Sequence, residues 1–181
     1  MEDFNLLVTY HPNQPGLAER EVVNCVENAG EEVEELESSC VNGVLCVRVT
    51  GDAKRVVSDI HMEFREDPNI LAHTFHWVPV ERWVPATVED MTEVARELAQ
   101  GIADDERWMM HVHKRRHDMT TEELVLALTD PISKGKVDLR NPEKIILVEV
   151  LGPMAAMALI TPDEVINANR MRQEIGLQRV R

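Results

Sequence analysis

The chain has 181 residues, of which 44% are hydrophobic, and its formal net charge is −14. This length allows one large domain or two small ones, and this composition excludes a chain that is disordered throughout. The apolar runs are too short for a membrane span, which needs about 18 residues, and the acidic N-terminus lacks the basic region of a secretory signal. We therefore expect a soluble, cytoplasmic protein without a membrane partner.

The first eighty residues alternate between strand-like and helix-like patterns. The predicted order is strand 4–10, helix 18–29, strand 33–40, strand 44–50, a helix between Asp52 and Asp67, and strand 70–79. Asn42-Gly43 predicts a tight hairpin between the two middle strands. The order βαββαβ is the ferredoxin-like arrangement, which we assign to residues 1–80.

The remaining residues, 81–181, predict a second domain of α/β type. Thr87 and Thr120 each precede an acidic residue by three positions, a spacing typical of a capped helix start. The predicted order is a helix after Thr87, strand 108–116, a helix from 120 to about 128, strand 145–151, strand 154–160 and a terminal helix begun by residues 161–164. The chain as a whole is therefore predicted to be of the α+β class.

The three cysteines, at positions 25, 40 and 46, are odd in number and widely spaced. This spacing fits neither a disulfide framework nor a CxxC metal site. We interpret them as small, reduced core residues.

Charge differs between the two halves. Residues 1–80 carry 15 acidic and 5 basic residues, whereas residues 81–181 carry 18 acidic and 14 basic ones. Basic residues end the predicted strand 108–116 and recur in the loop and strand start that follow, where we expect them to return to the same sheet and form a concave surface for phosphates. These residues are Lys114, Arg115, Arg116, Lys134, Lys136, Arg140 and Lys144. Acidic residues are interleaved with them, so a solvated sheet edge remains the alternative.

His111 and His113 share one face of a predicted strand and could bind a metal with a third ligand from elsewhere. The flanking cations would repel a divalent ion, so we expect no metal. The sequence contains no P-loop, GxGxxG or GxSxG motif, and we expect no cofactor. An enzyme that uses the two histidines in an unrecognised site stays open as an alternative.

The succession VHKRRH, TTEEL and KVDLRNPEKIILVEVLG resembles the THUMP domain of tRNA-modifying proteins, and the preceding βαββαβ unit resembles the ferredoxin-like domain that commonly precedes it. The resemblance implies binding of the tRNA acceptor region. It also implies RNA-binding roles for Lys114, Arg115, Arg116, Lys136 and Arg140, to which Lys134 and Lys144 are added on charge and proximity.

Within this family the chain is most similar to the stand-alone adaptor of tRNA cytidine acetylation. We therefore expect a non-catalytic protein that presents tRNA to a separate modifying enzyme and does not bind DNA. Trp77, Trp83 and Trp108 are interpreted as core or domain-junction residues rather than base-stacking platforms. The alternative function is a ferredoxin-like small-molecule-sensing or scaffold module that binds no RNA.

Overall fold

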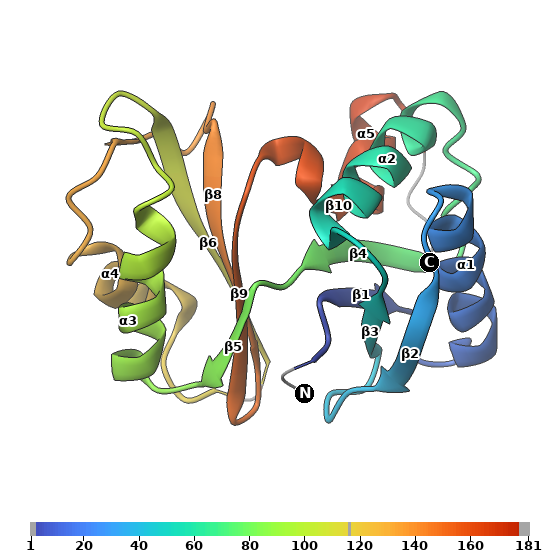
Figure 1. Cartoon of the computed structure of the whole chain (residues 1–181), viewed down its shortest axis with the longest axis horizontal. Coiled ribbons are helices and arrows are strands. Elements are labelled where there is room, and N and C mark those ends of the chain that lie inside the picture. Colours follow the sequence, from blue (N-terminus) through green and yellow to red (C-terminus); the bar gives the residue numbers. More distant parts are fainter. Residues whose placement is uncertain (1–2, 116, 178–181) are drawn as a thin grey trace. The chain divides into compact units, whose positions relative to one another are not determined.

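The computed structural model describes residues 3–115 and 117–177 (Figure 1). The chain is a mixed α/β protein that divides into two compact units, each built on its own sheet. The first unit comprises Asp3–Pro79 and the segment that begins at Asp163, and the second comprises Val80–Pro162. No helix in the described ranges is long and apolar enough to cross a membrane.

The first unit is an antiparallel sheet with helices packed on it. Its elements are, in chain order, β1 (Leu6–Tyr10), α1 (Pro15–Asn28), β2 (Val33–Ser38), β3 (Val44–Val49), α2 (Ala53–Glu66), β4 (Thr74–Pro79), β10 (Ile166–Asn167) and α5 (Ala168–Glu174). The strand order is β10-β4-β1-β3-β2, and every pair is antiparallel. Figure 1 shows α1 and α2 in blue and teal beside this sheet.

Strand alternation builds the core of the first unit. Leu6, Val8 and Tyr10 are buried on one face of β1. They pack in one cluster with apolar side chains of α1 and α2, among them Val22 and Ile60. Fully burying side chains of this kind stabilises a fold by about 1.5–3 kcal/mol each. The predicted hairpin between β2 and β3 is confirmed, but its loop has four residues because the backbone N–H of Ser39 bonds to the carbonyl of Val44.

The C-terminal segment departs from the sequence prediction. In place of one terminal helix, a short 3-10 turn (Pro162–Glu164) leads into β10 and then α5, whose N-cap is the side chain of Asn167. Ile166 is fully buried in the core of the first unit, and β10 pairs with β4. The assignment of the C-terminal helix to the domain 81–181 is therefore wrong, because apolar residues on either side of Asn167 complete the first sheet's core.

The second unit is a mixed sheet with helices packed on one face. Its elements are β5 (Arg82–Pro85), α3 (Val88–Ala99), β6 (Arg107–Arg115), α4 (Thr121–Thr129), β7 (Lys136–Val137), β8 (Lys144–Leu151) and β9 (Met154–Ile160). The strand order is β5-β9-β8-β6-β7, with β6 parallel to both β7 and β8 and the other pairs antiparallel. α3 and α4 pack against one face, where Met110, Val112 and Ile146 are buried.

Candidate nucleic-acid interface

The predicted basic residues lie at opposite ends of β6. Lys144 pairs in register with Trp108 and Lys136 with Arg107, whereas Lys114 pairs with Val150. Trp108 and Lys114 are six residues apart on one strand, which corresponds to about 20 Å. The structure therefore does not bring the predicted cations that it describes together in one concave surface.

The parallel pairing of β6 and β8 causes this separation. Parallel strands require a crossover connection, here through α4, and a crossover returns the chain to the end of the sheet where the first strand began. The basic loop that precedes β8 thus meets the start of β6, while Lys114 and Arg115 lie at its end. The predicted return to the same sheet is confirmed, but the predicted grouping of the basic loop with Lys114 and Arg115 is not.

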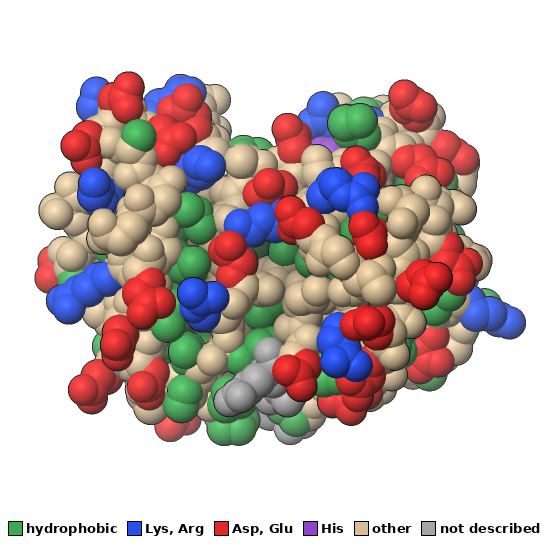
Figure 2. All heavy atoms as spheres, viewed as in Figure 1, with side chains coloured by type: hydrophobic (Ala, Val, Ile, Leu, Met, Phe, Trp, Pro, Cys, Tyr) green, Lys and Arg blue, Asp and Glu red, His purple; other side chains and the backbone are tan. Residues whose placement is uncertain are grey.

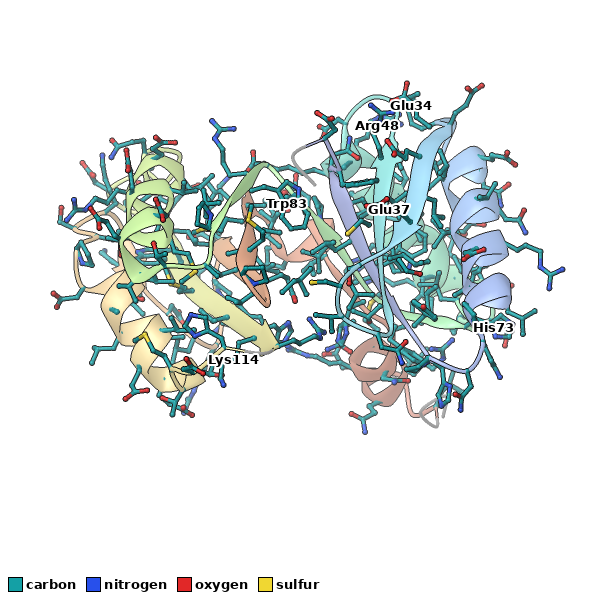
Figure 3. The ribbon with its side chains drawn as sticks, turned by 90° about the horizontal axis from the view of Figure 1, so that it is seen from below. Glu34, Glu37, Arg48, His73, Trp83 and Lys114 are labelled. Carbon is teal, nitrogen blue, oxygen red and sulfur yellow. The ribbon has the colours of Figure 1, made fainter. Side chains whose placement is uncertain are left out.

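Lys114 lies next to the last residue of β6 (Figure 3). Its Nζ donates a hydrogen bond of 3.2 Å to the carbonyl of His117 in the following loop. The His117 ring accepts at Nδ1 from the backbone N–H of Met119 and lies 3.1 Å from the carbonyl of Ala86 through Nε2, so the neutral Nε2–H form satisfies both contacts. Because a backbone carbonyl carries no net charge, this hydrogen bond does not neutralise the positive charge of Lys114. Arg116 lies outside the described residues.

The side chain of Arg115 forms an ion pair with Glu149 within the second unit. Its guanidinium donates to Glu149 Oε2 at 2.8 Å, and His113 Nδ1 lies 2.7 Å from Glu149 Oε1. Glu149 is only 3% exposed. Burial alone would raise the pKa of Glu149, but the hydrogen bond from His113 and the charges of His113 and Arg115 outweigh it and hold that pKa below its usual value.

The two histidines continue this network. His111 Nε2 lies 2.9 Å from His113 Nε2, so one imidazole donates and the other accepts. No group of three or more potential metal ligands occurs within residues 3–115 and 117–177. The His pair that the sequence singled out thus takes part in a hydrogen-bond chain that ends on a buried carboxylate.

At the start of β6, the chain turns closely around Trp108. The indole Nε1 donates to the carbonyl of Lys134 at 2.7 Å, and Lys136 N donates to the carbonyl of Glu106 at 2.8 Å. Gly135 between them has φ +58°, and a Cβ there would lie 2.6 Å from the Glu106 carbonyl. This position therefore requires glycine, which places Lys136 on the edge of the sheet.

The VDLRNP segment follows as a turn stabilised by Asp138. Asp138 Oδ1 accepts from the backbone N–H groups of Arg140 at 2.9 Å and Asn141 at 3.0 Å. The N–H of Asn141, then that of Arg140, keeps the pKa of Asp138 below its usual value. The turn leaves Lys136 and Arg140 exposed, together with Val137 and Leu139, which are 59% and 71% exposed.

Ion pairing separates the predicted cations into two groups. Arg115 is paired with Glu149, and Lys134 with Asp104 at 3.3 Å. Among the residues that the structure describes, the candidate cations without an acidic partner within ion-pair distance are Lys114, Lys136, Arg140 and Lys144. On the face shown in Figure 2, basic side chains are scattered among acidic ones rather than gathered in one patch.

Two residues of this region, Arg107 and Glu149, were not among the predicted ones. Arg107 opens β6 beside Lys136 and bonds to Glu143 at 3.2 Å. Glu149 binds Arg115, and a lone carboxylate in the apolar run IILVEVL was a sequence signal for a buried partner. The interpretation of the tryptophans agrees with the structure for Trp77 and Trp108, which are 0% and 1% exposed, while Trp83 is half-buried.

No protein-family model and no curated protein sequence matches this chain. Solved structures do match its fold. PH1313 from Pyrococcus horikoshii Ot3 has a TM-score of 0.60 at 14% identity, covering 91% of this chain and 55% of that protein. TrmN from Thermus thermophilus has a TM-score of 0.59 at 15% identity, covering 94% and 48%. A 4-thiouridine synthetase solved in complex with RNA and bound ATP has a TM-score of 0.50 at 10% identity, covering 92% and 42%.

The chain thus spans about half the length of these proteins. Identities of 10–15% establish a likeness of fold. The chain shares its fold with a part of PH1313, of TrmN and of the 4-thiouridine synthetase.

Proposed function

We propose that this protein binds the acceptor region of tRNA in the cytoplasm and presents it to a separate modifying enzyme. The observation that carries the proposal is the set of four cations without ion-pair partners, Lys114, Lys136, Arg140 and Lys144, at the two ends of β6. They lie on β6, β7, β8 and the turn between β7 and β8, whereas the other exposed arginines without an ion-pair partner among the described residues, Arg20, Arg65 and Arg96, lie on the helices α1, α2 and α3. Cations on neighbouring strands of one sheet can make charge-assisted hydrogen bonds to phosphate groups.

The resemblance of VHKRRH and KVDLRNP to THUMP domains supports a tRNA ligand, and so does the fold shared with a synthetase that was solved with RNA. The order β4-β1-β3-β2 within a βαββαβ unit supports a ferredoxin-like domain before it. The cations at the two ends of β6 are about 20 Å apart, and this separation suits contacts to separate phosphates of one folded RNA. RNA helices are recognised largely through shape, phosphates and 2′-hydroxyls, which such separate contacts serve.

The adaptor part of the proposal rests on charge and on the family resemblance. Residues 1–80 carry a net charge of −10, which repels phosphate and suits a protein surface. The resemblance to the stand-alone adaptor of tRNA cytidine acetylation makes a cytidine acetyltransferase the proposed partner. The chemistry would then belong to the partner enzyme.

The test compares tRNA binding by the wild-type chain with that of the variant Lys114→Ala/Lys136→Ala/Arg140→Ala/Lys144→Ala. We expect at least a tenfold loss of affinity across tRNA species, because phosphate contacts are insensitive to sequence. Arg115 is left intact because it supports Glu149. The matched control, Arg20→Ala/Arg65→Ala/Arg82→Ala/Arg96→Ala, removes the same charge from exposed positions outside the candidate set and should bind almost as well as wild type.

Equal losses in the two variants would refute the site, since net charge alone would then explain binding. Modification of purified tRNA by the chain without a second protein would refute the non-catalytic role. Absence of tRNA binding, with a metabolite raising the melting temperature, would favour the sensing-module alternative.

A further inference from the structure

A groove of about 410 Å³ runs along α1 in the first unit. One wall is α1, from which Leu17, Arg20, Asn24 and Asn28 line the groove. The other wall belongs to residues 70–73, which precede β4 and contribute side chains that include His73. We call this feature the α1 groove. None of the seven predicted RNA-binding cations lines it.

Hydrogen bonds hold the two walls of the α1 groove together. Glu21 on α1 is 9% exposed and accepts from the backbone N–H groups of Ala72 at 2.7 Å and His73 at 2.9 Å. The His73 ring, which Figure 3 shows close to α1, lies 3.0 Å from Gln14 Oε1 through its Nδ1. The groove is therefore formed before any partner arrives, which lowers the entropic cost of binding.

The polar side chains of the helix wall are available to a partner. Arg20, Asn24 and Asn28 are exposed, and within the described part of the chain their side chains make no hydrogen bond or ion pair. Asn24 lies in the interior of α1, where asparagine favours a helix less than alanine does. Neither an internal contact nor helix propensity therefore explains an asparagine at this position.

The two asparagines match the repeat of an extended peptide. They are four residues apart on α1, which corresponds to a rise of about 6 Å along the helix. In an extended peptide, amide groups that point the same way recur every two residues, about 6.6 Å apart. A carboxamide offers both a donor and an acceptor, so Asn24 and Asn28 can each pair with one peptide unit of such a segment.

Charge and apolar contacts define which peptide fits. Arg20 is the only lysine or arginine among the described residues that line the groove, and the one acid among them, Glu21, is buried against backbone N–H groups. A carboxylate beside Arg20 would form a charge-assisted hydrogen bond. Leu17, which is 38% exposed, and the half-buried Ile70 offer contact to an aliphatic side chain.

The surrounding charge favours a peptide over RNA. Residues 1–80 carry 15 acidic and 5 basic residues, and this net negative charge repels a strand that has a phosphate at every nucleotide. A peptide with a single carboxylate meets much less repulsion. The amide repeat that suits the two asparagines is also absent from a sugar–phosphate backbone.

We propose that the α1 groove binds an extended segment of a protein partner that carries an acidic residue two positions from an aliphatic one. Side chains two positions apart point to the same side of an extended chain, which sets this spacing. The backbone of the segment would pair with Asn24 and Asn28. Its carboxylate would bind Arg20, and its aliphatic side chain would pack on Leu17 and Ile70. That this partner is the tRNA-modifying enzyme rests on the proposed function; the binding surface itself does not.

The probe is a phage-displayed library of random 12-residue peptides, selected on the full chain. We expect enrichment of peptides with Asp or Glu two positions from Leu, Ile or Val. Arg20→Ala should weaken their binding about tenfold, as loss of a central contact does. The matched control is Arg65→Ala, which removes an exposed arginine from α2, outside the groove, and should change binding less than twofold.

A second variant tests the asparagines. Asn24→Ala/Asn28→Ala should also weaken binding about tenfold, and because alanine favours the helix, circular dichroism should show that α1 stays folded. In an NMR titration of the wild-type chain with a selected peptide, the side-chain carboxamide signals of Asn24 and Asn28 should shift.

Enrichment of no peptide, or of basic ones, would overturn the proposal. Equal effects of Arg20→Ala and Arg65→Ala, or unchanged binding by the asparagine variant, would overturn it as well. Displacement of the peptide by total tRNA would assign the groove to RNA and have the same consequence.

The two proposals fail separately, because the proposed RNA-binding cations do not line the α1 groove. Arg20→Ala should leave tRNA affinity within twofold of wild type, and the four-cation variant of the tRNA test should bind the peptide as wild type does. A wild-type chain that binds no tRNA would sink the proposed function without affecting the peptide result.

Discussion

Removing the guanidinium of Arg115 should destabilise the second unit through Glu149. The Glu149 carboxylate is 3% exposed and receives hydrogen bonds from Arg115 and His113. Breaking a buried ion pair by removing one partner costs about 3–5 kcal/mol. The Arg115 side chain is 30% exposed and therefore partly screened, and His113 remains in place, so we expect about 2–3 kcal/mol for Arg115→Ala.

The assay is urea unfolding at pH 7, with amide exchange at β8 reporting on the second unit. A double-mutant cycle with Glu149→Gln isolates the pair, and the coupling energy should account for more than half of the loss in Arg115→Ala. Arg82→Ala is the control, because Arg82 is 57% exposed and its contact to Glu97 is 3.8 Å long. That control should cost less than about 0.5 kcal/mol.

The pH dependence has a defined sign. Glu149 has a lowered pKa in the folded state, so its ionised form contributes stability above the pKa of an unfolded glutamate, about 4.3. That contribution is lost as the pH falls through the lower, folded-state pKa. The difference between wild type and Arg115→Ala should therefore be largest at pH 6–7 and shrink below about pH 4. A loss under about 0.5 kcal/mol at pH 7, or an equal loss at pH 3.5 and pH 7, would refute this reasoning.

Two further predictions concern the first unit. Glu21 is buried on α1 and accepts hydrogen bonds from the backbone N–H groups of Ala72, His73 and Thr74, so Glu21→Ala should lower the free energy of unfolding in urea by about 2–4 kcal/mol. Glu27 is exposed on the same helix, and Glu27→Ala should lower it by less than about 0.5 kcal/mol. Equal effects of the two substitutions would contradict the role assigned to Glu21. Burial raises the pKa of Cys25 to about 12 and that of Cys46 to about 11, whereas Cys40 is exposed. Because the thiolate is the form that reacts, iodoacetamide at pH 8 should label Cys40 alone in the folded chain. Mass spectrometry reads the label, and modification of Cys46 at a rate like that of Cys40 would contradict the burial.

Local signals predicted most elements of the fold. The capped helix starts expected at Thr87 and Thr120 are both present, and Thr120 with Glu123 forms the complete capping box. The helix expected after Asp52 is also present, with Asp52 as its N-cap. These motifs depend on residues within one helical turn, so the sequence contains all that is needed to find them. Strands β1 and β3 were also found to within two residues, because each is a short run rich in apolar residues, most of which the structure buries.

The misses depended on contacts between distant residues. Pro162 and the acids after it predicted a long helix, but the pairing of Ile166 with Trp77, 89 positions earlier in the chain, draws the segment into a sheet. Cys40 was expected in the core and is exposed, because it falls in the four-residue loop after β2.

The candidate interface shows the same limit. Charge alone identified seven cations, and the apolar run 145–151 identified the strand that follows them. The charge pattern could not show that Arg115 forms an ion pair with Glu149, or that the parallel pairing of β6 and β8 separates Lys114 from Lys144. Both facts require the register of β6 against β8, which no local pattern encodes.

The salt dependence of tRNA affinity tests the central claim most directly. If Lys114, Lys136, Arg140 and Lys144 each neutralise one phosphate, replacing all four by Ala should reduce the magnitude of the slope of log K against log salt concentration by about 3. The control variant at Arg20, Arg65, Arg82 and Arg96 should keep the wild-type slope. Parallel lines for wild type and the four-cation variant would contradict the account, because those side chains would then release no counterions on binding.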